Sequence, residues 1–264
     1  MISSLISKVF NSAPVLDDNS KAWIIDSFDW ALANLDQDFF EQSTQLVLPT
    51  NEFYPGRVNS VEEMAKVIFD KTKEYAGLSQ WPIVPAAPQS ALPTAIPNLG
   101  VGAKSRGQEP SFSLASELRG TIPVRIHPQQ VNQVQDLIGY LVQTLVNIYV
   151  NQMLVNQTVE LPPGGEETAA QRVDLIAVFL GFGVIFSNTA YQFKGGCGSC
   201  NNASLNRQAG LPEVETLYAL SVFCHHKSIK PKTVLPHLKS HLKSSYKRCV
   251  KEVANDIAKR QTGA

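Results

Sequence analysis

The chain has 264 residues, of which 44% are hydrophobic and 17% are charged, and its formal net charge is zero. This composition is typical of a folded globular protein, and the length is sufficient to bury a substantial core. A net charge of zero provides no overall field that would favour nucleic acid. We therefore expect a single domain over residues 1–264 that does not bind nucleic acid.

The N-terminal sequence MISSLISKVFNSAP has no basic stretch followed by a long apolar one, so no signal peptide is predicted. The longest strongly apolar segment, residues 175–186, is much shorter than the roughly 20 residues that a membrane-spanning helix needs. We expect a cytoplasmic protein without a membrane span. In that compartment the cysteines are thiols or metal ligands rather than disulfides.

The first elements are predicted from apolar spacing and capping residues. Residues 20–35 place apolar side chains at helical spacing, with Asn19 or Ser20 as the N-cap. Residues 44–48, TQLVL, predict a short strand that stops at Pro49.

A second helix is predicted over 61–76, because Ser60 and Glu63 have the spacing of a capping box. Gly77 is the expected residue after its end. Six prolines then exclude a long helix within residues 82–110 and predict an extended excursion, either a surface loop or a mobile lid.

Two short strands are predicted in the middle of the chain, over 82–84 and 121–126, the second at a sheet edge because it contains Pro123. Four further helices are predicted over residues 136–152, 166–191, 211–226 and 232–258. These elements indicate an α+β protein that is predominantly helical and has a small sheet.

The last predicted helix is basic. Residues 227–260 contain ten lysines and arginines but only two acids, Glu252 and Asp256. The excess is either a solvated helix face or a docking surface for an acidic partner. His237 and His241 are four residues apart on this helix, but the lysines around them disfavour cation binding, so we expect both to be solvated.

The helix predicted over 136–152 carries polar residues four positions apart, which places them on one face. In zinc peptidases a His-Glu-x-x-His sequence occupies such a face, with two His ligands and a Glu base. Here those positions are Gln143, Thr144 and Asn147. The spacing is that of a metal site, but the residue types are not.

Four segments of the chain carry recognisable motifs. In chain order these are the loop Pro-Thr-x-Glu-Phe-x-Pro, the strand with the polar helix just described, an Asp-Leu-x-x-Val-Phe-x-Gly-x-Gly sequence and a Tyr-Ala-Leu sequence. They cover residues 46–78, 122–147, 173–190 and 206–223. In this order they resemble a little-characterised family of bacterial zincin-like proteins. The resemblance implies a zincin-like helix pair beside a small sheet.

The resemblance also implies roles for four residues. In the family's intact pattern two His bind zinc, a Glu activates water and an Asp completes the metal shell; these positions fall on Gln143, Asn147, Thr144 and Asp174. Amide oxygens are poor zinc ligands, and threonine cannot act as a carboxylate base. We therefore expect a pseudoenzyme with a degenerate motif, no catalytic residue and no cofactor at this vestigial site.

Two alternatives concern the same side chains. The oxygens of Gln143, Asn147 and Asp174 are of the type that calcium or magnesium prefers. Alternatively, the three side chains hydrogen-bond one another inside a helix pair, because buried polar groups need partners. We expect the second arrangement.

Cysteines form a second candidate site. Cys197 and Cys200 have CxxC spacing in a glycine-rich loop, and Cys224 with His225 or His226 supplies ligand types for a structural zinc. The alternatives are a redox pair or ordinary thiols, because Cys224 lies on an apolar helix face.

The leading functional expectation is a non-catalytic protein that binds an unknown protein or small ligand through the vestigial cleft. One alternative is a metal-dependent hydrolase or zinc-binding protein that uses Cys197 and Cys200. Another is a structural subunit that docks through its basic C-terminal helix.

Overall fold

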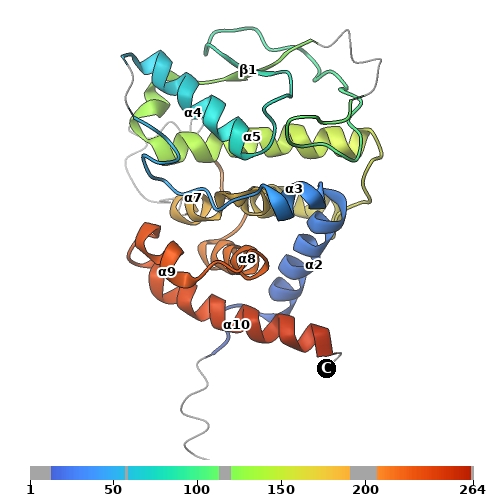
Figure 1. Cartoon of the computed structure of the whole chain (residues 1–264), viewed down its shortest axis with the longest axis vertical. Coiled ribbons are helices and arrows are strands. Elements are labelled where there is room, and N and C mark those ends of the chain that lie inside the picture. The colour runs from blue at the N-terminus through green and yellow to red at the C-terminus, as the bar shows by residue number, and fades with distance from the viewer. Residues whose placement is uncertain (1–12, 57–58, 113–119, 191–206, 263–264) are drawn as a thin grey trace, which may run out of the picture.

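The computed structural model describes residues 13–56, 59–112, 120–190 and 207–262. These residues form a predominantly helical α+β protein with one small sheet, which confirms the predicted fold class (Figure 1). The helices are α2 (Asp18–Asn34), α3 (Gln37–Gln42), α4 (Val61–Tyr75), α5 (Val134–Val155), α6 (Ala169–Ala177), α7 (Gly183–Thr189), α8 (Glu213–His226), α9 (Pro231–Val234) and α10 (Leu242–Thr262), and the strands are β1 (Ile83–Ala86) and β2 (Ile122–Arg125).

The elements are stacked in layers along the long axis of the molecule (Figure 1). The sheet and α4 lie at one end, followed by α5, then α6 and α7, then α8, with α10 across the other end. Helix α2 runs along one side and packs against α6 and α8. Each helix therefore buries an apolar face against its neighbours, as a layered core requires.

The central layer is a nearly continuous helical rod in which α6 and α7 are joined by a π-helical turn, Val178–Phe182. The stretch Gly165–Thr189 is long and apolar enough, by length and composition, to cross a membrane. However, 83% of its most apolar window is buried inside the protein. Core helices pass the same test of length and apolarity, because a helix that is apolar all round is buried.

The segment predicted as a strand at 44–48 is not one. It runs extended across the π-helical turn, where Val47 N donates to Gly181 O at 2.9 Å. Gly181 has φ +100°, and a Cβ there would lie 2.1 Å from Gln45 O. Leu46 and Val47 are buried in the core, but the partner of this segment is a helix kink rather than another strand.

The helix starts show how short polar side chains set the first turn. Helix α2 begins earlier than predicted, because Asp17 rather than Asn19 or Ser20 is the N-cap and accepts from Ser20 N at 2.9 Å. At α4 the predicted cap is confirmed, since Glu63 N donates to Ser60 Oγ at 3.0 Å. The Glu63 carboxylate accepts from Asn59 N instead of Ser60 N, so the capping box is shifted by one residue.

Both predicted strands exist and form a two-stranded parallel sheet, β1 with β2. Ile122 N donates to Pro82 O, so the backbone groups of even-numbered residues form the hydrogen bonds between the strands. The backbone groups of odd-numbered residues point to the two outer edges of the sheet. Pro85 and Pro123 therefore both lie on outward edges, where they supply no N–H donor.

Two backbone carbonyls on the same edges accept hydrogen bonds from side chains. Lys73 Nζ donates to Ile83 O at 3.0 Å on the β1 edge, and Tyr140 Oη donates to Arg125 O at 3.1 Å on the β2 edge. Prolines and side-chain hydrogen bonds on free edges are features that protect a sheet against pairing with another strand. The sheet is thus a poor template for adding a peptide strand.

The prediction of a single C-terminal helix over 232–258 is wrong. Helix α9 passes into a short 3₁₀ turn, Leu235–His237, and the chain becomes extended at Leu238, with φ −84° and ψ 144°. Helix α10 then begins at Leu242. His237 and His241 consequently do not share a helix face, because the break contains Pro236, which cannot continue a helix interior.

Candidate functional site

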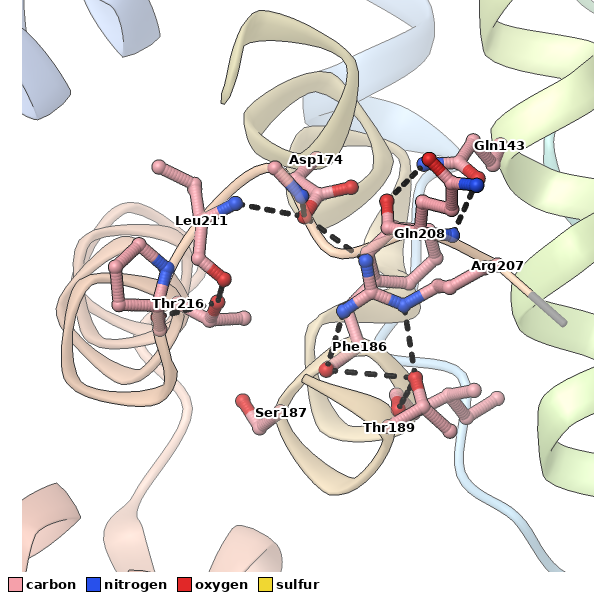
Figure 2. A network of polar contacts seen from close by, with 12 residues as sticks. Gln143, Asp174, Phe186, Ser187, Thr189, Arg207, Gln208, Leu211 and Thr216 are labelled. Carbon is pink, nitrogen blue, oxygen red and sulfur yellow. Dashed lines mark hydrogen bonds and ion pairs between the residues drawn. The ribbon is translucent and has the colours of Figure 1, made fainter. Parts of the chain in front are cut away.

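Helix α5 presents the predicted polar stripe toward the segment that precedes α8. Gln143 Nε2 donates to Gln208 O at 2.8 Å, and Gln208 N donates to Gln143 Oε1 at 3.2 Å. Both ends of the amide are thus bonded to one backbone residue (Figure 2). Thr144 and Asn147 hydrogen-bond within their own helix, to Tyr140 O and Gln143 O.

Asp174 lies on the buried face of α6 and is fully excluded from solvent. Its Oδ2 accepts from Arg207 Nη1 at 2.8 Å, from Gly210 N at 2.8 Å and from Leu211 N at 3.0 Å. The carboxylate is therefore neutralised by a guanidinium and held by two backbone donors, the arrangement that makes a buried charge tolerable. Its other oxygen has no partner among the described residues.

Arg207 connects this carboxylate to the end of α7 (Figure 2). Nε donates to Thr189 Oγ1 and Nη2 donates to Phe186 O, both at 2.9 Å, and the guanidinium lies 4.2 Å from the centre of the Phe186 ring. A Cβ at Gly139 on α5 would lie 3.1 Å from Arg207 Cδ. Burial lowers the pKa of Arg207, and the Asp174 carboxylate opposes that shift.

The structure corrects the predicted partners of the polar stripe. The side chains of Gln143, Asn147 and Asp174 do not hydrogen-bond one another. Instead, residues 207–211 connect α5 to α6, and the polar side chains of both helices hold that segment. We call this set of contacts, made by Gln143, Asp174 and Arg207 to and within residues 207–211, the polar lock.

The polar lock does not fit a metal ion. Arg207 already contributes the positive charge beside Asp174, and the Gln143 amide is bonded at both ends to the backbone of Gln208. Across the described parts of the chain, no group of three or more His, Cys, Asp and Glu side chains is placed to hold a metal. Two of the oxygens expected for calcium or magnesium are engaged elsewhere, because Gln143 Oε1 accepts from Gln208 N and Asp174 Oδ2 accepts from Arg207.

Of the second candidate site, Cys197 and Cys200 lie outside the described residues. Cys224 is buried on α8, whereas the neighbouring His225 is exposed. Burial raises the pKa of the Cys224 thiol to about 11 and that of Cys249, buried on α10, to about 12. Thiolates are the zinc ligands and the nucleophiles, so both groups have the character of core thiols.

Neither of these buried thiols should react in the folded protein. At pH 8 an alkylating reagent is expected to leave Cys224 and Cys249 unmodified, because both are buried and protonated. In denaturant both should be modified completely. Peptide mapping by mass spectrometry would measure this, and rapid alkylation of native Cys224 would show that the thiol is instead accessible and ionised.

A hollow of about 760 Å³ lies between the end of α2, α3 and residues 103–109, within the volume range of small-molecule sites. None of Gln143, Thr144, Asn147 and Asp174 lines it. Its polar lining includes Asn34, Gln37, Asp38, Gln42, Glu74, Ser79, Lys104, Gln108 and Glu109. The hollow is thus separate from the polar lock.

Asp36 and Phe39 fix the wall of this hollow. Asp36, with φ +55°, accepts from Ser105 N at 3.0 Å and Arg106 N at 2.9 Å, which attaches residues 103–109 to α3. The Phe39 ring packs against Gly77, where φ is +77° and a Cβ would lie 2.7 Å from Phe39 Cε1. Only glycine fits this close approach.

The buried Arg106 beneath Phe39 serves the fold. Its guanidinium lies 4.7 Å from the Phe39 ring centre and donates to Leu35 O at 3.2 Å, at the C-terminal end of α2. A cation there is stabilised by the helix dipole and satisfies a carbonyl that the helix leaves unpaired. Arg106 is therefore committed to the end of α2.

Sequence reasoning found Gln143 and Asp174 but missed Arg207. The available signal was Asp174 itself, a carboxylate within an apolar run, which requires a cation from elsewhere in the chain. Which cation supplies the charge depends on long-range folding.

Comparisons of the chain with protein-family models, with curated proteins and with solved structures find no match.

Proposed function

We propose that this chain is a non-catalytic, metallopeptidase-like protein of the cytoplasm that acts by binding a ligand or a partner. The observation that carries the proposal is the polar lock. Two of the positions that the family resemblance assigns to metal ligands, Gln143 and Asp174, are used to hold residues 207–211 in place. An arginine in contact with Asp174 disfavours any cation at the same carboxylate, because like charges at this distance repel strongly.

Binding through a cleft at the former site has little support, because residues 207–211 occupy it. The hollow beside α3 is the better candidate for a ligand, since its volume lies within the range of small-molecule sites, although its lining is more polar than is usual for them. Its lining carries both acids and bases, and the charged pair Lys104 and Glu109 is 3.9 Å apart. With four acidic and two basic side chains in the lining, this composition favours a polar ligand that is neutral or cationic.

Elemental analysis and thermal unfolding in equimolar zinc test the proposal. Protein purified without chelators should contain much less than one zinc per chain, and added zinc should leave Tm unchanged, because a metal that binds only the folded state raises Tm. Peptide hydrolysis should not exceed that of buffer.

Two variants identify the source of any metal. Zinc that is lost on Asp174→Ala would overturn the proposal and restore a metal site at the polar lock. Zinc that is retained in Asp174→Ala but lost in Cys197→Ser/Cys200→Ser would support the cysteine alternative and leave the polar lock non-catalytic.

A further inference from the structure

Helix α10 has an outward face that is strongly basic. Its apolar side chains Leu242, Tyr246, Cys249 and Val253 are buried against the protein. On the opposite side Lys247, Arg248 and Lys251 are exposed, and Lys243 and Lys259 flank them. These five residues, here called the basic face, span about 24 Å of helix at 1.5 Å per residue. Helix α10 lies across one end of the molecule (Figure 1).

Both acids of α10 are bonded to groups of the protein body and share one lysine, Lys21 of α2. Glu252 pairs with Lys21 at 2.6 Å and accepts from Val15 N at 3.0 Å. Asp256 lies 3.5 Å from Lys21 and accepts from Tyr218 Oη at 2.8 Å. The two carboxylates are therefore engaged away from the basic face, and with Lys21 they leave a formal charge of −1 against the +5 of that face.

Charge is also separated along the whole chain. Residues 227–260 hold ten of the 23 basic side chains and two of the 23 acidic ones, which leaves 13 basic and 21 acidic residues elsewhere. A net charge of zero thus conceals a net charge of +8 in the C-terminal segment and −8 in the remainder. Such a molecule is oriented by a charged surface, with the C-terminal segment toward an anionic one.

We propose that the basic face docks on a bilayer surface rich in anionic lipids. Four to eight basic residues on one helix suffice for electrostatic adsorption to such a surface. The apolar side of α10 is already buried in the core, so the helix adsorbs without inserting, unlike an amphipathic anchor. The binding is consequently reversible by salt.

The chemistry of the basic face favours lipid over protein or nucleic acid. Protein interfaces depend on aromatic and arginine anchors in a desolvated centre, whereas this face has lysines around small residues such as Ala254 and Ala258. Its one arginine, Arg248, is already bonded to Ala13 O. The chain as a whole has no net charge that would attract nucleic acid.

Co-sedimentation of the full chain with lipid vesicles tests the proposal. The chain should bind phosphatidylcholine vesicles that contain about 30% phosphatidylserine at roughly 50 mM salt, and should be released at roughly 500 mM. Vesicles of phosphatidylcholine alone should not bind. Each surface lysine contributes about fivefold to partitioning, so Lys243→Glu/Lys247→Glu/Lys251→Glu should reduce it at least ~100-fold.

A matched variant separates the basic face from total charge. Lys66→Glu/Lys71→Glu/Lys104→Glu makes the same change of charge at surface positions outside α10 and should alter partitioning by less than about tenfold. Circular dichroism would verify that both variants are folded. Equal losses in the two variants, binding to uncharged vesicles, no binding, or binding to duplex DNA but not to vesicles would each overturn the proposal.

Discussion

Replacing Arg207 with methionine is expected to lower the free energy of unfolding by about 3–5 kcal/mol, the usual result of removing one partner from a buried ion pair. The carboxylate of Asp174 is fully buried and would lose its only neutralising cation among the described residues. For a chain of this size the change corresponds to a fall in Tm of roughly 10 °C. Denaturant unfolding followed by circular dichroism would measure it.

The matched control is Arg260→Met, which removes an exposed ion pair with Asp26, 2.6 Å apart. Exposed pairs contribute about 0–1 kcal/mol, so this variant should be nearly neutral. The double variant Asp174→Asn/Arg207→Met should be more stable than the sum of the two single effects implies, by about 1–3 kcal/mol, because the residues are in direct contact. If Arg207→Met costs no more than Arg260→Met, the polar lock does not hold the fold together.

Gly181→Ala is expected to be the second most damaging change, at about 3 kcal/mol or more. The residue has φ +100°, which L-residues rarely adopt, and its new Cβ would lie 2.1 Å from Gln45 O. Relief requires separating residues 44–48 from the π-helical turn, which would weaken the bond from Val47 N to Gly181 O. Denaturant unfolding again gives the cost.

Gly165→Ala isolates the backbone part of this effect. Gly165 also has a positive φ, +56°, but a Cβ there meets no atom within 4 Å. This variant should cost about 1 kcal/mol, the usual penalty for a left-handed residue that is not glycine. A Gly181→Ala variant as stable as Gly165→Ala would mean that residues 44–48 can move away from the π-helical turn at no cost in stability.

The long helices and both strands were predictable because their signals are local. Apolar spacing located α2, α4, α5 and α8, and proline with alternation located β1 and β2. The two errors have different causes. Residues 44–48 and residues 235–241 have apolar patterns typical of regular structure, but a distant helix kink in one case and a proline break in the other determine their conformation.

Some features of the candidate site could likewise be predicted from the sequence. The spacing of Gln143, Thr144 and Asn147 on one helix, and the residue types that disfavour zinc and base chemistry there, follow from the sequence alone. The sequence also determined the charge separation between the C-terminal segment and the rest of the chain.

Only the tertiary structure decided the partners. Arg207 is 33 residues from Asp174, and Gln208 is 65 residues from Gln143, so neither contact has a local signature. The orientation of Glu252 and Asp256 toward the protein body, away from the basic face, likewise depends on Lys21 of α2. Local spacing determines which side chains share a helix face, whereas the packing of distant segments determines which partner each buried polar or charged group has.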